Sequence, residues 1–226
     1  MFIQKACGGG EIDITLLYTM KSPLDWSPST YGYFLATTYA CVGLTTLALL
    51  PFLIRFFRLT DLTLVAIGYV FKAASLAMIA YGQHTWLVFL SAVVGSPGVL
   101  IMTSAKSIIS KLVGEDEQGK AFSLLSCGEN VANLIGSMLF ALVYAATVSS
   151  MPSLVFILDC SFTTALLCAH LVVAYHVTKS SSLLQAQSTA TQYRSLETTT
   201  LDSAAPADDV DPPQDDLIID DTAEQQ

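Results

Sequence analysis

Long hydrophobic runs with few or no charged residues recur five times along the chain. Each is roughly 20 residues or longer, the length that an α-helix needs to cross a bilayer. A membrane β-strand needs only about ten alternating residues, so a barrel does not fit these runs. They occupy residues 31–54, 62–81, 85–105, 121–147 and 152–177. The pattern predicts an all-α membrane protein that crosses the bilayer several times.

A shorter apolar segment, Ile12–Met20, precedes these runs and is too short to span. We interpret residues 1–20 as a truncated first helix, which would make six helices in all. Basic residues favour the cytoplasmic side of a membrane protein, and here they occur in alternate loops. They are Arg55, Arg58, Lys106, Lys111, Lys120 and Lys179. These loops and the C-terminal tail are therefore predicted to be cytoplasmic.

Composition supports a membrane protein and separates the tail from the rest. The 226 residues are 53% hydrophobic and only 13% charged, about half the charge of a typical globular chain. Residues 1–176 are nearly neutral, whereas the last 50 residues hold ten of the 19 acidic residues. No basic face exists to bind phosphates, which excludes a nucleic-acid partner.

The tail, residues 178–226, is rich in Ser, Thr, Gln, Asp and Pro. Such a segment buries too little apolar surface to offset its ordering entropy, so we expect a disordered acidic cytoplasmic tail. Tyr193 and Leu196 form a Tyr-x-x-bulky pattern that a sorting adaptor binds as an extended peptide. This pattern also arises often by chance.

Besides two histidines in the last run, the predicted spans contain one lysine, Lys72, and two acidic residues, Glu129 and Asp159. Such groups usually face a partner or a water-filled cavity. Lys72 and Glu129 lie at similar depths, about 15 and 12 Å from the cytoplasmic side, so we expect them to pair. Glu129 or Asp159 could take up a proton, or these charged groups could simply hold helices together. For Lys72 and Asp159 we favour the structural role. Glu129 has polar neighbours, Asn130 and Asn133, which favours a wet cavity.

The third long run is interrupted at its centre by Gly95, Ser96, Pro97 and Gly98. Interrupted membrane helices often line substrate sites in transporters, although a packing kink is an equal alternative. No phosphate-binding glycine loop, nucleophile triad or metal-ligand spacing is present in the sequence. We therefore expect no cofactor, no metal and no enzymatic activity.

The stretch after the third run contains Ser110-Lys-Leu-Val, Glu117-Gln-Gly119 and Phe122-Ser123. The predicted outer loop before the first run, with the first residues of that run, contains Pro23, Trp26 and Gly32. In this combination the chain resembles solute carrier family 46, the proton-coupled folate transporter family of the major facilitator superfamily. The resemblance covers residues 8 to about 177. It corresponds to the second half of that family, helices seven to twelve.

The resemblance implies the C-terminal six-helix half of a major facilitator fold, with residues 1–20 as family helix 7. It also implies proton-coupled transport of a folate-like or related organic anion by alternating access. Lys106 stands where folate-transporting members have a basic residue that handles anions and protons, and Asp13 matches an acidic position. Gly8 stands where those members have a histidine.

The expected substrate pathway combines the residues of the resemblance with those of the intramembrane polar pattern. They are Asp13, Gly95, Pro97, Gly98, Lys106, Glu129, Asn130 and Asn133. Expected partners are the lipid bilayer, an organic anion and a proton, and the protein is expected in the plasma membrane or in endosomes or lysosomes. The alternative is a truncated, non-transporting membrane protein that pairs with a full-length transporter or with the missing N-terminal half.

Overall fold

A computed structural model describes residues 1–21, 24–57, 59–82 and 84–203, and every regular element in these residues is helical. The all-α prediction is therefore confirmed. The elements are α1 (Phe2–Thr19), α2 (Pro28–Leu44), η1 (Thr45–Leu49), α3 (Leu50–Phe57), α4 (Asp61–Ala80), α5 (Thr85–Gly95), η2 (Ser96–Gly98), α6 (Val99–Leu112), η3 (Glu115–Glu117), α7 (Gln118–Thr147) and α8 (Leu154–Ser203).

Several of these elements join end to end into longer helices. A π-helical turn, η1, links α2 to α3, and a 3₁₀ turn, η2, links α5 to α6. Within the described residues, five helices are long and apolar enough to cross a membrane, and each overlaps one of the five hydrophobic runs. They are Pro28–Phe56, Asp61–Ala80, Thr85–Leu112, Glu115–Thr147 and Leu154–Leu183. The chain is a multi-pass membrane protein.

Helix α1 starts well before the apolar segment Ile12–Met20 that predicted it. It begins at Phe2 and is 18 residues long, about 27 Å at 1.5 Å per residue. The three glycines at positions 8–10 do not end it, because α1 packs closely along α7 and small residues allow that approach. A Cβ on Gly136 of α7 would lie 1.9 Å from the Ala6 carbonyl oxygen. Helix–helix packing thus overrides the weak helix propensity of glycine here.

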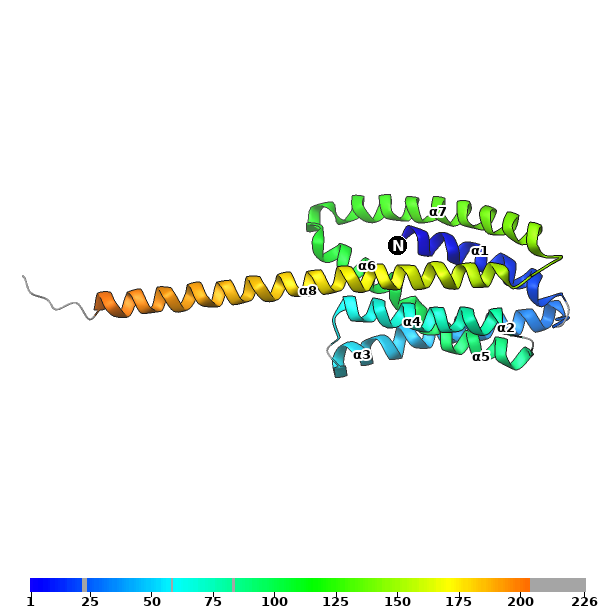
Figure 1. The fold of residues 1–226 in the computed structure, drawn as a ribbon, viewed down its shortest axis with the longest axis horizontal. Coiled ribbons are helices and arrows are strands. Elements are labelled where there is room, and N and C mark those ends of the chain that lie inside the picture. The colour runs from blue at the N-terminus through cyan, green and yellow to red at the C-terminus, as the bar shows by residue number, and fades with distance from the viewer. Residues whose placement is uncertain (22–23, 58, 83, 204–226) are drawn as a thin grey trace, which may run out of the picture. The chain divides into compact units, whose positions relative to one another are not determined.

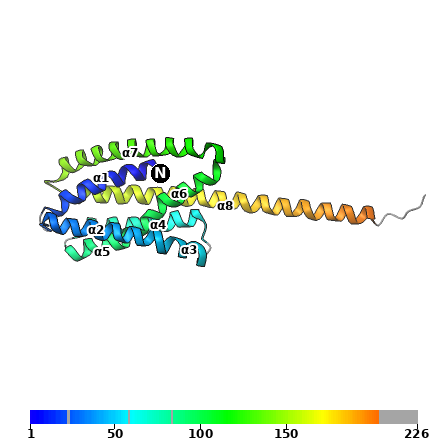
Figure 2. The same ribbon diagram turned by 180° about the vertical axis from the view of Figure 1, so that it is seen from behind.

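The chain divides into two units, residues 1–176 and residues 177–226. In the first unit α1 lies beside α7, while α4 packs against α5, η2 and α6 (Figures 1 and 2). A buried cluster joins α1, α4, α7 and α8 through residues such as Ile14, Leu76, Tyr144 and Phe156. A second cluster around Trp26, near the start of α2, joins that helix to α5.

The second unit differs from the disordered tail expected for residues 178–226, because α8 continues to Ser203. Ser and Thr are the commonest residues of 178–203, but this segment contains neither Gly nor Pro, and nine of its 26 residues are Leu, Gln or Ala, which favour helix. The backbone of Tyr193 and Leu196 is helical, whereas the sorting motif was predicted to bind as an extended peptide. The side chains of both residues, and all of residues 204–226, lie outside the described part of the chain.

Candidate functional site

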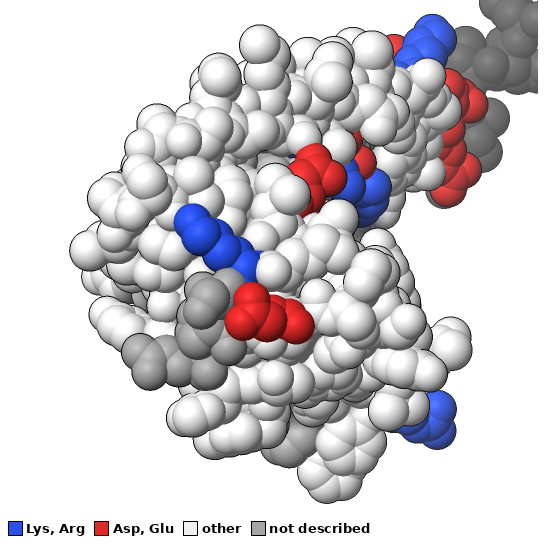
Figure 3. All heavy atoms as spheres, turned by 90° about the vertical axis from the view of Figure 1, so that its right-hand side faces the viewer, with Lys and Arg blue, Asp and Glu red and all other residues white. Residues whose placement is uncertain are grey.

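A cavity of about 400 Å³ opens among the helices of the first unit. A space-filling view shows this unit hollowed on one side, with a few charged side chains in the hollow and mostly uncharged side chains around it (Figure 3). Helices α1, α2, α4, α5 and α6 and the turn η2 all contribute to the lining, and α7 contributes Asn133. The site is therefore built by the same helices that form the bundle.

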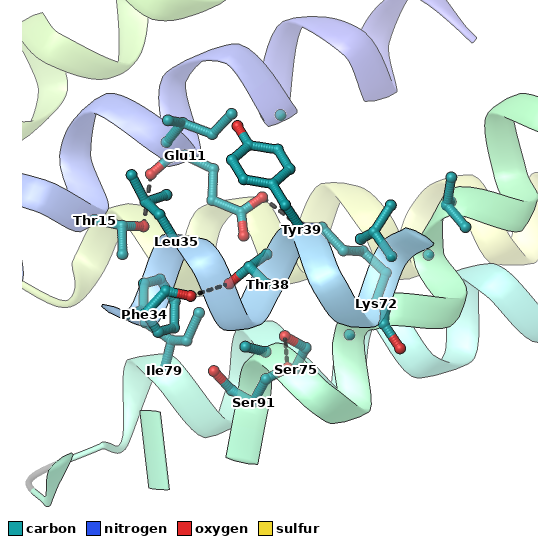
Figure 4. Close-up of a pocket in the computed structure, with 18 of the residues that line it drawn as sticks. Glu11, Thr15, Phe34, Leu35, Thr38, Tyr39, Lys72, Ser75, Ile79 and Ser91 are labelled. Atoms are coloured by element: carbon teal, nitrogen blue, oxygen red, sulfur yellow. Dashed lines mark hydrogen bonds and ion pairs between the residues drawn. The ribbon is translucent and has the colours of Figure 1, made fainter. Parts of the chain in front are cut away.

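Helical periodicity explains which residues of α2 reach the cavity. Lining positions on α2 recur three or four residues apart, as expected for one face of a helix. They are Tyr31, Phe34, Leu35, Thr38, Tyr39 and Val42. This face gives the cavity an aromatic and aliphatic wall with a few hydroxyl groups (Figure 4). The opposite wall is more polar.

An ion pair between Glu11 of α1 and Lys72 of α4 lies at the wall of the cavity, and both residues line it (Figure 4). The side chain of Glu11 is 14% exposed and that of Lys72 is 19% exposed. Gly98 of η2 lies against the aliphatic part of Lys72, so the 3₁₀ turn leaves room for the lysine stem. The pair supplies one cation and one carboxylate to a cavity that is mostly apolar and whose polar lining also includes Lys5 and Asn133.

A third ionisable group, Asp159 of α8, lies behind this pair. It is 1% exposed and does not line the cavity. It is close enough to Glu11, Lys72 and the Cys7 thiol for electrostatic interaction. One of its oxygens accepts a 3.5 Å hydrogen bond from Thr163. Two carboxyl groups therefore share the surroundings of one lysine.

The predicted break in the third long helix is present as the 3₁₀ turn η2. The Thr45 hydroxyl donates a 3.0 Å hydrogen bond to Ser96 Oγ, and the Ser96 hydroxyl donates a 2.9 Å bond to the Val93 carbonyl. Gly95 and Gly98 line the cavity, whereas Pro97 is buried and does not. The turn thus brings backbone and small residues to the site.

Most other residues of the predicted pathway lie away from the cavity. Asp13 is exposed and accepts a hydrogen bond from Ser137. Lys106 pairs with Glu129 at 3.1 Å, and Asn130 is exposed. Of the predicted polar side chains, only Asn133 and Lys72 line the cavity.

The expected pair between Lys72 and Glu129 is wrong. Lys72 pairs with Glu11, and Glu129 pairs with Lys106. Depth along a helix gives one coordinate of a side chain, but the direction around the helix axis decides which neighbour it meets. Glu11 was missed because intramembrane charges were sought only within the five long apolar runs, and Glu11 lies in the short first helix just before Ile12–Met20. Its spacing from the buried residues Thr15 and Tyr18 would have placed it on the inner face.

A second polar cluster joins α4 to α6 outside the cavity. Asp61 accepts hydrogen bonds from Lys111 at 2.5 Å and from Ser107 at 3.1 Å. The Lys111 side chain is 67% exposed. Lys111, like Lys72, is a lysine in an ion pair, but it does not line the cavity. The same substitution at Lys111 is therefore a control for Lys72.

Comparisons with known proteins identify the group to which this architecture is similar. A family model described as Major Facilitator Superfamily matches residues 8–201. The proton-coupled folate transporter of Rattus norvegicus is 30% identical over 66% of this chain and 32% of its own length. The lysosomal proton-coupled steroid conjugate and bile acid symporter of Gallus gallus is 29% identical over 67% of this chain and 32% of its own length. Solute carrier family 46 member 2 of Mus musculus is 25% identical over 66% of this chain and 31% of its own length.

Proposed function

Because the chain belongs to the major facilitator superfamily, we propose that it is the C-terminal six-helix half of a proton-coupled secondary transporter that carries an organic anion by alternating access. The resemblance to solute carrier family 46 is confirmed by its relatives. The matched segment spans about a third of the length of these relatives. Two of them are named as proton-coupled carriers, one of folate and one of steroid conjugates and bile acids.

The observation that carries this proposal is the Glu11–Lys72 ion pair at the cavity wall. Lys72 is a cation in an apolar setting, where it attracts an anionic group strongly. Glu11 competes with that anion for the ammonium group. A proton on Glu11 removes this competition, so binding of the anion and uptake of the proton favour each other.

The shape and chemistry of the rest of the cavity suggest the class of substrate. A volume of about 400 Å³ is within the usual range for small-molecule sites. The α2 face supplies Tyr31, Phe34 and Tyr39 as flat apolar contacts, and Thr38 as a hydroxyl. This wall suits an anion with a ring system.

Uptake of labelled organic anions by cells that produce the chain tests the proposal. The chain is expressed alone and together with the N-terminal six helices of a family 46 transporter, and uptake of a folate and of a steroid sulfate is compared in acidic and neutral medium. We expect acid-stimulated uptake that Lys72→Met abolishes. Lys111→Met makes the same chemical change outside the cavity and should retain most of the uptake. Equal uptake with and without Lys72 would contradict the role of this residue.

The same cells separate transport from the alternative of a regulatory membrane protein. A protein that only pairs with a full-length transporter would give no uptake in either combination. It would instead change the uptake by a co-expressed full-length family member, and Lys72→Met would not alter that effect. Such a result would replace the transport proposal.

A further inference from the structure

The two carboxyl groups around Lys72 raise a question of charge balance. Within the described residues, Lys72 is the cation that faces both Glu11 and Asp159. One ammonium group neutralises one carboxylate, so a second ionised carboxylate would leave a net negative charge in the bundle interior. A buried charge without its own partner is strongly unfavourable.

The two carboxyl groups do not compete equally for the lysine. Glu11 forms the ion pair with Lys72 and is partly exposed to the cavity. Asp159 is 1% exposed, and its Oδ2 atom has no hydrogen-bond partner among the described residues. Its nearby titratable groups on the packed helices are Cys7 and Glu11 of α1 and Lys72 of α4. A thiol is a weak hydrogen-bond donor and cannot replace a cation.

We propose that Glu11, Lys72 and Asp159 form one proton-binding site, in which Asp159 holds a proton at neutral pH while Glu11 pairs with Lys72. The protonated carboxyl group makes the three-residue cluster electrically neutral. The Cys7 thiol and the Thr163 hydroxyl then surround an uncharged acid, which removes the cost of an unpaired buried carboxylate.

The site links proton number to the charge that the cavity presents. With one proton the cluster is neutral, and with a second proton on Glu11 it carries one positive charge at the cavity wall. Tyr31 and Tyr39 of α2, Lys5 of α1 and Asp13 are the other titratable groups near Glu11 and the cavity. The positive state attracts one anionic charge, so one proton would enter with each charge of the substrate. This coupling step rests on the proposed function, whereas the proton on Asp159 does not.

Infrared spectroscopy of the purified chain in micelles of an alkyl maltoside, a detergent without carbonyl groups, tests the site without any substrate. A protonated carboxyl group has a C=O stretch that an ionised one lacks. At neutral pH the wild-type chain should show one such band, and ¹³C labelling of the aspartate carboxyl groups should shift it. A carboxyl group in water has a pKa of about 4 and gives no such band at neutral pH. A wild-type spectrum without an aspartate-sensitive band would overturn the proposal.

Variants then assign the band and distinguish the cluster from a single isolated acid. Asp159→Asn should remove it. Glu11→Gln should also remove it, although Asp159 is unchanged, because Asp159 then becomes the ionised partner of Lys72. Lys72→Met should add a second band, from protonated Glu11. Asp13→Asn, a change outside the cluster, should leave the spectrum unchanged.

A band that persists in Asp159→Asn would assign the proton elsewhere, and a band that persists in Glu11→Gln would show an isolated acid; either result refutes the shared site. The wild-type measurement decides by itself whether a protonated aspartate is present. If Glu11→Gln does not fold, Glu11→Asp, which keeps the carboxylate, should retain the band of Asp159, and its loss would refute the shared site. Failure of anion uptake would refute the proposed function and leave the infrared result standing.

Discussion

Lys72 and Lys106 each pair with a carboxylate on another helix, but the surroundings of the two pairs differ. Glu11 and Lys72 are both largely buried. In the second pair the Glu129 side chain is 11% exposed and that of Lys106 is 42% exposed. Lys106 can therefore reach a polar environment without its partner, whereas Glu129 cannot.

This asymmetry predicts unequal effects of removing the two partners of the Lys106–Glu129 pair. Lys106→Met leaves a buried carboxylate without its cation and should destabilise the protein by about 3 kcal/mol. Glu129→Gln leaves a lysine that can extend toward the polar boundary and should cost about 1 kcal/mol or less. Thermal unfolding of the purified chain in detergent, followed by circular dichroism, measures both. The double variant should recover most of the loss seen in Lys106→Met; a double variant as unstable as that single one would contradict this account.

The sequence identified the charged residues inside the helices better than it identified their partners. Lys72, Glu129 and Asp159 stood out because ionisable residues are rare in apolar runs. Glu11 did not, since it precedes a short apolar segment and follows three glycines. The partners depend on the direction of each side chain around its helix, which three-dimensional packing sets and a single sequence does not show.

At the scale of elements, the closest approach is that of α1 and α7. Gly136 lies directly against the backbone of Ala6, and this contact holds the first helix to the bundle. Ala132 and Gly136 are small residues four positions apart, a spacing that favours close helix packing, and Gly136 lies at the contact with α1. The pairing of α1 with α7 was not predicted, because the order of the helices along the chain does not show which of them pack together.

A methyl group at position 136 should therefore separate these two helices. Gly136→Ala places a Cβ atom inside the contact distance of the Ala6 backbone, which cannot move without shifting α1. We expect a loss of about 1–3 kcal/mol, typical of overpacking. Gly32→Ala is the matched control, because a Cβ there meets nothing within 4 Å and alanine favours helix. Thermal unfolding of both variants checks the prediction, and equal stability would show that α1 and α7 do not pack as described.

At the scale of the whole molecule, the five long apolar helices of the described residues followed from the hydrophobic runs alone, although several of these helices extend beyond the ends of the runs. The orientation in the membrane remains a prediction, since it rests on the distribution of Lys and Arg between loops. The continuation of α8 to Ser203 was not foreseen, because the polar composition of that segment outweighed its helix-favouring residues in the argument.

Cysteine labelling tests the predicted orientation. In a background without the five native cysteines, Ser149→Cys should react with a membrane-impermeant reagent added to intact cells. Gly114→Cys, in the loop between α6 and α7, should react only after the membrane is opened. The reverse pattern would place the basic loops and the tail on the opposite side.

The 3₁₀ turn η2 has a rotational consequence for α6. Three residues at three per turn advance the chain by about 60° more than they would in an α-helix. A helical wheel that treats Thr85 to Leu112 as one regular α-helix therefore places the α6 side chains about a sixth of a turn away from their true direction around the helix axis. If Ser96–Gly98 relaxed into regular α-helix, α6 would rotate by that angle, and Lys106 and Lys111 would both turn away from their carboxylates on α7 and α4. The three residues of η2, beside the cavity, thus set the rotation of α6 about its axis and thereby determine which ion pairs form farther along that helix.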